Sequence, residues 1–335
     1  MASTKKLTNT NNSHNSNIHY DELTEIKAIF FDLDNTLIPT RSGDSKACRE
    51  VSEILQRQYG FTKDEANYST QNFLKSFRRC PDNCQTSLDI WRTHLWHEAL
   101  PPKYKQLATT IYPIWLSLRY RYLAIPKEYV QLLKHLRKHY LLALITNGPS
   151  NAQWEKVRQL NVRQYFDCLL VSGDLPWEKP NPNIFYSACK YLNVQPQQCC
   201  MVGDKLESDI KGGNLAGLSA TFWIPLSLDE IEKLLRNTSE EYAAEHKPTF
   251  ILRNLLEFYD YFNVTKDKEE EQYEERKVEE EKHNELLLLE QKQVPEYKKC
   301  QSKNIVYCRG RSSSPATQPP IEFLTSESDN SSDSI

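Results

Sequence analysis

Short apolar runs alternate with longer amphipathic segments over most of this chain, and the alternation predicts its secondary structure. A short continuous apolar run is typical of a strand buried on both faces of a parallel sheet, whereas apolar residues spaced three and four apart are typical of a helix. Candidate strands lie at residues 27–31, 140–145, near 168, 199–202, near 221 and 249–252. Candidate helices lie at residues 126–139, 150–160, 183–192, 208–215 and 228–235, with a last one reaching about 262.

Strands and helices that alternate in this way predict an α/β fold, in which a Rossmann-like parallel sheet is covered by helices on both faces. Between Asp44 and Ile125 the strand pattern disappears and helical spacing takes over. The candidate helices of this segment are 45–59, 63–77, 86–100 and 103–122. We interpret the segment as a helical cap domain inserted into the sheet domain.

The predicted organisation therefore has four parts. They are a disordered leader at 1–24, an α/β core formed by 25–44 and 124–263, the inserted helical cap at 45–123, and a tail at 264–335. The tail begins as a charge-rich run and ends rich in Ser and Pro, a composition that favours a disordered or partly helical segment. A protein partner bound through the tail is a second possibility that the composition leaves open.

Composition and charge narrow the class of protein. A length of 335 residues with 39% hydrophobic residues allows a core domain and an accessory domain. The net charge of −3 gives no reason to expect nucleic acid or a membrane surface as a partner. The chain has no apolar run of about 18 residues and no hydrophobic signal segment, and its nine cysteines suit reduced thiols. We therefore expect a soluble cytoplasmic protein.

Two cysteines and two histidines of the chain could in principle form a zinc site. The candidate ligands are Cys80, Cys84, His94 and His97. Their spacings, Cys-x3-Cys and His-x2-His, differ from those of the usual zinc fingers, so we do not expect zinc there.

The first candidate strand ends in FFDLDNTL, which places Asp32 and Asp34 one residue apart. Open α/β sheets bind ligands at the carboxyl edge of their strands, and strand residues i and i+2 share a face. One carboxylate can attack phosphorus while a second carboxyl group protonates the leaving alcohol. Taken alone, the pair is also compatible with a helix cap and a turn residue.

Three later stretches place further polar groups at the same predicted edge. Thr146 and Asn147 follow the second strand and offer a hydroxyl and an amide, although a plain strand-to-helix turn would have the same residues. Lys179 lies in a proline-rich loop that would stiffen it for pairing with a carboxylate and a phosphate, while a surface lysine is the ordinary alternative. Asp204 and Asp209 bracket a loop that would complete an oxygen-rich Mg²⁺ site.

These four stretches, in this order, resemble the four motifs of the haloacid dehalogenase superfamily. The runs FFDLDNTLI, LITNG, EKPNPNIFYSACKYLNVQP and MVGDKLESDIKGGNLAGL are similar to the superfamily's phosphatases of sialic acid synthesis. The resemblance runs from Ile26 to about Phe262. It implies a Mg²⁺-dependent phosphomonoesterase that forms an aspartyl phosphate and hydrolyses a small sugar phosphate, N-acylneuraminate 9-phosphate. A phosphatase or phosphomutase for another sugar phosphate, or a non-catalytic scaffold acting through its tail, are the alternatives.

The resemblance also implies a role for each motif residue. Asp32 is the nucleophile, and Asp34 is the general acid that afterwards activates water. Mg²⁺ is held by Asp32, the main-chain carbonyl of Asp34 and Asp204, with Asp209 supporting the site indirectly. The phosphoryl oxygens are bound by Thr146, Asn147 and Lys179. A phosphatase is favoured over a dehalogenase, because the latter needs no metal and so neither Asp34 nor Asp204.

Lys205 departs from the pattern of the related phosphatases, which have a small hydroxyl residue after the metal-binding aspartate. A cation at this position would either compete with Mg²⁺ or point to solvent, and we favour the second interpretation.

The cap offers arginines for the carboxylate of an acidic sugar. They are Arg78, Arg79, Arg92, Arg119 and Arg121. We expect Arg92 and Arg119 to bind substrate, because their segments also resemble the related phosphatases. The cap aromatics Trp91, Trp96, Tyr112 and Trp115 are expected to form its packing core rather than a sugar platform.

Overall fold

A computed structural model describes residues 23, 25–79, 87–236 and 245–262 of the chain. The predicted leader, apart from Leu23, and the predicted tail at 264–335 lie outside the described residues, and so do Cys80 and Cys84. The predictions made for them therefore stay predictions.

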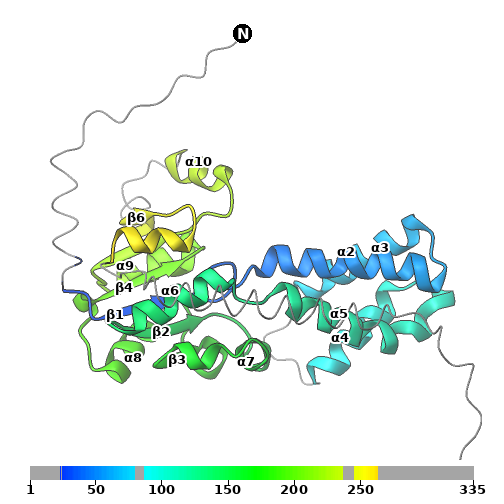
Figure 1. Ribbon diagram of the computed structural model, residues 1–335, viewed down its shortest axis with the longest axis horizontal. Helices are drawn as coiled ribbons and strands as arrows, with labels where there is room; N and C mark the ends of the chain where they lie inside the picture. Colours follow the sequence, from blue (N-terminus) through cyan, green and yellow to red (C-terminus); the bar gives the residue numbers. More distant parts are fainter. Residues whose placement is uncertain (1–22, 24, 80–86, 237–244, 263–335) are drawn as a thin grey trace, which may run out of the picture. The chain divides into compact units, whose positions relative to one another are not determined.

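The centre of the fold is a six-stranded parallel sheet with the strand order β3-β2-β1-β4-β5-β6 (Figure 1). The strands are β1 (Ala28–Phe31), β2 (Leu141–Thr146), β3 (Cys168–Val171), β4 (Cys199–Gly203), β5 (Ala220–Trp223) and β6 (Phe250–Ile251). The first strand lies between β2 and β4, with Ala28 opposite both Leu141 and Cys199. The predicted α/β fold with a parallel sheet is confirmed.

Side chains of the sheet alternate between two apolar cores. Ile29 and Phe31 belong to one core, which includes Leu132 and Leu136 of helix α6 (Lys127–Arg137). Phe30 belongs to the other core, which includes Phe185 of helix α8 (Pro182–Leu192). Because both faces are covered, β1 is apolar at every position instead of alternating with polar residues. The remaining helices of this part are α7 (Ser150–Gln159), α9 (Lys211–Leu215) and α10 (Leu228–Arg236).

Four helices that lie between β1 and α6 in the sequence pack against one another (Figure 1). They are α2 (Thr40–Tyr59), α3 (Lys63–Phe77), α4 (Leu88–Ala99) and α5 (Ala108–Tyr122). Their side chains form a third apolar core. Phe73 lies at its centre, stacked on Trp96 with 3.9 Å between ring centroids and in edge contact with Trp115 at 4.7 Å. Trp96, Tyr112 and Trp115 are buried, which confirms the packing role expected for them. The domain boundaries proposed at 44/45 and 123/124 stay predictions.

Local sequence signals explain where these helices begin and end. Helix α2 ends at Gly60, whose φ of 69° is in the left-handed region that glycine adopts without strain. Helix α3 begins with a capping box, in which the Thr62 hydroxyl accepts from the Glu65 N–H and the Glu65 carboxylate accepts from the Thr62 N–H. None of the helices in the described ranges is long and apolar enough to cross a membrane.

Several helix boundaries differ from the sequence-based expectation, and the last predicted helix is a 3₁₀ helix at Leu255–Asp260. Helix α2 begins at Thr40 instead of 45, where Thr40 lies beside the strand-end turn. The segment 103–122 is divided into a 3₁₀ turn (Pro102–Leu107) and α5, because Pro101 and Pro102 start a tight turn. The segment 208–215 opens as a π-helical turn, η5 (Leu206–Ile210), next to the candidate site.

Replacing Phe73 with alanine is expected to lower the free energy of unfolding by about 3–5 kcal/mol, since it leaves a cavity beside the rings of Trp96 and Trp115. Tyr68→Ala is the matched control on the same helix, because Tyr68 is 66% exposed, and its expected cost is below about 0.5 kcal/mol. Urea denaturation followed by tryptophan fluorescence measures both. Equal losses in the two variants would contradict the central position of Phe73.

Candidate functional site

The carboxyl ends of three neighbouring strands bring the predicted site residues together. Asp32 follows β1, Thr146 ends β2, and Asp204 follows β4. The Asp32 N–H donates to the Val202 carbonyl of β4 at 3.0 Å, so the main chain is still held by the sheet at the residue that carries the first carboxylate. All three side chains are buried.

Lys179 lies between two of these carboxylates. Its Nζ is 2.7 Å from Asp32 Oδ1 and 2.7 Å from Asp209 Oδ1, and its side chain is only 1% exposed. The loop that carries Lys179 is held by Asn147, whose Nδ2 donates to the Lys179 carbonyl at 2.7 Å and whose Oδ1 accepts from the Lys179 N–H at 2.9 Å. Asn147 therefore positions the lysine in this structure.

The acidic cluster of Asp32, Asp204 and Asp209 has the composition of a cation site. Oxygen atoms of the three carboxylates lie within 4.8 Å of one another. Within the described residues, Lys179 is the one cation bonded to the cluster, so two negative charges stay unbalanced when all three carboxyl groups are ionised. Asp204 Oδ1 is buried without a hydrogen-bond partner among these residues. Buried carboxylate oxygens with surplus negative charge fit a hard divalent cation such as Mg²⁺.

Thr146 also has a buried polar atom without a partner in the described part of the chain, its Oγ1. A hydroxyl at the end of β2 that bonds to none of the described protein groups is available to donate to an oxygen of a bound phosphoryl group.

The main chain at Asp204 is fixed by its neighbours. A Cβ atom at Gly203 would lie 2.2 Å from Asp209 Oδ2, so only glycine lets the two segments approach this closely. The same Asp209 oxygen accepts from the Lys205 N–H at 3.0 Å. On the other side, Trp223 Nε1 donates to the Asp204 carbonyl at 2.9 Å. These contacts determine the orientation of Asp204 and the direction in which Lys205 leaves the main chain.

Burial controls the electrostatics of the cluster. It raises the pKa of Asp32 above the ordinary carboxyl value, an effect that Lys179 opposes and Asp209 increases. Burial likewise raises the pKa of Asp204, with further increases caused by Asp32 and Asp209. Burial alone would lower the pKa of Lys179, but Asp209 and Asp32 outweigh it and raise the pKa. The lysine is therefore a permanent cation, while Asp32 and Asp204 hold protons more strongly than an ordinary carboxyl group.

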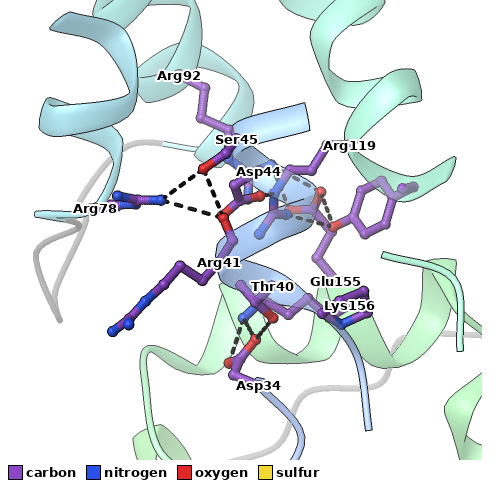
Figure 2. Close-up of polar contacts among 12 residues, drawn as sticks. Asp34, Thr40, Arg41, Asp44, Ser45, Arg78, Arg92, Arg119, Glu155 and Lys156 are labelled. Atoms are coloured by element: carbon purple, nitrogen blue, oxygen red, sulfur yellow. Dashed lines mark hydrogen bonds and ion pairs between the residues drawn. The ribbon is translucent and has the colours of Figure 1, made fainter. Parts of the chain in front are cut away.

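Asp34 has an opposite environment. Lys156 Nζ lies 2.7 Å from both of its carboxylate oxygens, and the Thr40 hydroxyl donates to Oδ1 (Figure 2). Gln153 Nε2 also donates to Oδ2, at 3.0 Å. Burial alone would raise the pKa of Asp34, but the charge and hydrogen bond of Lys156 outweigh it and hold the pKa far below the usual range. Asp34 is therefore a carboxylate in this structure.

The contacts of Asp34 were not foreseen from the sequence, although a signal for them exists. Gln153 and Lys156 are three positions apart on α7, on the same helix face as the buried Val157. A glutamine and a lysine in the buried stripe of an amphipathic helix, directly after the Thr146 turn, indicate that these side chains contact a polar group at the end of the sheet.

The two cap arginines expected to bind substrate are both bonded to carboxylates of the protein (Figure 2). Arg92 Nη1 lies 2.8 Å from Glu155 Oε2, and Arg119 Nε lies 2.7 Å from Asp44 Oδ1. Each arginine is 2% exposed. Glu155 belongs to α7, so its pair with Arg92 joins the helical segment to the helix that holds Asp34. The substrate contacts expected for Arg92 and Arg119 stay predictions, and they would require these pairs to open.

Comparisons with known proteins found a matching family model, similar sequences and similar solved structures. A family model described as haloacid dehalogenase-like hydrolase matches residues 26–217. The chain is 38% identical over 207 residues to the N-acylneuraminate-9-phosphatases of Rattus norvegicus and Homo sapiens, covering 60% of this chain and 84% of each relative. It is 31% identical over 199 residues to a glyceraldehyde 3-phosphate phosphatase of Pyrococcus furiosus, covering 59% of this chain and 80% of the relative. A crystal structure of a HAD phosphatase from Thermococcus onnurineus superposes with a TM-score of 0.45 at 26% identity, covering 70% of this chain and 97% of the other.

Removing the carboxylate of Glu155 is expected to be costly, because it leaves the buried Arg92 cation unpaired. Glu155→Ala should lower the free energy of unfolding by about 3 kcal/mol. Glu53→Ala, which breaks an exposed pair with Arg57, should cost less than about 1 kcal/mol. Urea denaturation measures both variants. A loss for Glu155→Ala no larger than for the control would show that Arg92 does not depend on this partner.

When a chelator keeps the protein free of metal, its free energy of unfolding is expected to fall as the pH rises from about 4 toward neutrality. The raised pKa values of Asp32 and Asp204 mean that these groups stabilise the folded state while protonated, and this stability is lost as they ionise. The lowered pKa of Asp34 has its effect at lower pH. Ionised Asp34 stabilises the folded state, and this stabilisation is lost as the pH falls below about 4.

Denaturation of the wild type and of Asp204→Asn at about pH 5 and about pH 7.5 tests this dependence. The variant should show the smaller decrease, because it removes one of the two titrating groups and its repulsion of the other. An equal decrease in both proteins would contradict the assignment.

Proposed function

The chain belongs to the haloacid dehalogenase-like hydrolases and is a phosphoric monoester hydrolase, and from this premise we propose that it hydrolyses N-acylneuraminate 9-phosphate with the help of Mg²⁺. The observation that carries the chemistry is the bonding of Lys179 to Asp32 within a buried cluster of three carboxylates. The choice of substrate is supported by the 38% identity to N-acylneuraminate-9-phosphatases over 84% of their length.

In this proposal Asp32 attacks phosphorus. The bond from phosphorus to the leaving alcohol breaks while a bond to an Asp32 oxygen forms, and water then hydrolyses the resulting acyl phosphate. Lys179 would reduce the repulsion between the Asp32 carboxylate and the phosphate dianion, and would bind a phosphoryl oxygen together with Thr146. Asn147 would contribute by holding Lys179 in place.

The chain's own residues fit the proposed metal. Asp32, Asp204 and the main-chain carbonyl of Asp34 would hold Mg²⁺, and Asp209 would support them by bonding to Lys179 and to the Lys205 N–H. Bound Mg²⁺ would neutralise charge on the transferring phosphoryl group. The unpartnered Asp204 Oδ1 supports this assignment.

Asp34 would serve both halves of the reaction. Its carboxylate, held by Lys156, Gln153 and Thr40, is in the form that accepts a proton from the attacking water. To protonate the leaving alcohol in the first half of the reaction, Asp34 must itself be protonated. This requires a longer distance between the Asp34 carboxyl group and Lys156 Nζ during that step.

A smaller phosphate ester is the second candidate substrate. It is favoured by the 31% identity to a glyceraldehyde 3-phosphate phosphatase and by the carboxylate partners that Arg92 and Arg119 already have. Both substrates would use the same residues at the sheet edge and differ in what binds the leaving group.

Phosphate release from N-acetylneuraminate 9-phosphate, glyceraldehyde 3-phosphate and a panel of hexose phosphates tests the proposal. We expect turnover selective for the nine-carbon ester, abolished by a chelator and restored by Mg²⁺. Asp32→Asn should lower kcat by about three orders of magnitude or more, because it removes the nucleophile.

Asp64→Asn is the matched control, since Asp64 lies in the first turn of α3, away from the strand ends, and should keep full activity. A thermal unfolding scan of each variant shows whether it is folded. Turnover of glyceraldehyde 3-phosphate alone would replace the proposed substrate, and full activity of Asp32→Asn would refute the mechanism.

A further inference from the structure

A cavity of about 510 Å³ borders the acidic cluster. Asp204 forms one end of its wall, Trp223 and Leu206 contribute apolar surface, and Lys233 belongs to the part of the wall formed by α10. Arg41, at the start of α2, lines the cavity as well. The cavity therefore begins beside the proposed metal aspartate and continues toward α10.

Three cations of the cavity wall have no carboxylate partner among the described residues. Arg41, Lys205 and Lys233 form no ion pair with any residue in the described part of the chain. Figure 2 shows the Arg41 guanidinium directed away from the bonded groups around Asp44. These charges contrast with Arg92 and Arg119, which are neutralised by protein carboxylates.

The acidic residues of the same wall are engaged elsewhere. Glu230 accepts from the Leu226 N–H at 2.8 Å, and Glu207 is bonded to His246 at 2.7 Å. Asp204 belongs to the acidic cluster. An anion entering the cavity would therefore meet cations whose charge is not already balanced by direct contact.

Lys205 is the best positioned of the three cations. Its N–H is bonded to Asp209, and the preceding carbonyl is bonded to Trp223, so its main chain is held from two sides. The rigid attachment places its side chain at the cavity directly beside Asp204. A small hydroxyl residue at this position would leave the same cavity without this charge.

We propose that this cavity binds the organic part of the substrate, and that Arg41, Lys205 and Lys233 select a leaving group that carries a carboxylate. The inference rests on the proposed function and deepens it. In N-acylneuraminate 9-phosphate the carboxylate and the phosphate lie at opposite ends of the molecule. With the phosphate at Asp32, the leaving group extends along the cavity, its carbon skeleton contacts Trp223 and Leu206, and its carboxylate is paired by the unbalanced cations.

Two phosphate esters that differ only at the carboxyl group, which is ionised in one and methylated and neutral in the other, test this selection with the full chain at saturating Mg²⁺. They are N-acetylneuraminate 9-phosphate and its carboxyl methyl ester. The wild type should prefer the acid by about ten-fold in kcat/KM, the size of one charged hydrogen bond. Lys205→Gln, Arg41→Gln and Lys233→Gln should each reduce this preference.

Lys190→Gln is the control, because Lys190 is exposed at the end of α8 and does not line the cavity, and the preference should be kept. A change in metal affinity caused by Lys205→Gln acts on both esters equally and cancels in the ratio. If the wild type hydrolyses the acid while all three cavity variants keep its preference, the cavity inference is overturned and the proposed function stands.

A binding measurement separates the two claims in the absence of turnover. In the Asp32→Asn protein, calorimetric titration with N-acetylneuraminate should detect a complex, and adding Lys205→Gln should weaken it by about ten-fold. This result supports the cavity even if the wild type prefers another ester in the activity assay. Absence of binding, or binding unchanged by Lys205→Gln, overturns the inference.

Discussion

The buried contact between Lys179 and the carboxylates of Asp32 and Asp209 is the interaction on which the site depends. Three carboxylates at the end of a parallel sheet repel one another and lose solvation, so a buried ammonium is needed to hold them together. The surrounding structure serves this arrangement: Asn147 holds the lysine loop, and Gly203 allows Asp209 to approach β4. The charge that Lys179 leaves unbalanced makes the same cluster suitable for a divalent cation.

Two aspartates only one residue apart are given opposite properties by their neighbours. Asp32 lies among carboxylates and holds its proton more strongly than usual, whereas Asp34 is held as an anion by Lys156. Such separation of two carboxyl groups lets one site supply both a nucleophile and a proton carrier. Because Lys156 and Glu155 are neighbours on α7, the helix that contacts Asp34 also contacts the inserted helical segment through Arg92.

In the proposed function, reaction and selectivity would be divided between different parts of the chain. The strand ends contain groups that suit phosphoryl transfer from any small phosphate ester, and the groups proposed to distinguish leaving groups lie outside them. In this structure the buried arginines of the helical segment take part in internal pairs, and the cations without such partners line the cavity next to Asp204. Under this proposal, selectivity for charge rests on Lys205 and Lys233 of the core and on Arg41 at the start of α2, rather than on the buried arginines of the helical segment.

The sequence by itself determined the parallel sheet and the convergence of Asp32, Thr146 and Asp204, because apolar runs reveal buried strands and parallel strands end at one edge. Helical periodicity likewise identified the aromatic core around Trp96 and Trp115. Only the tertiary structure decided which partner each charged side chain pairs with. Arg92 and Glu155 are 63 positions apart, and Arg119 and Asp44 are 75 apart. Periodicity shows which face of a helix is buried. The partner across the interface depends on how segments distant in the sequence pack together, and a local sequence pattern does not contain that information.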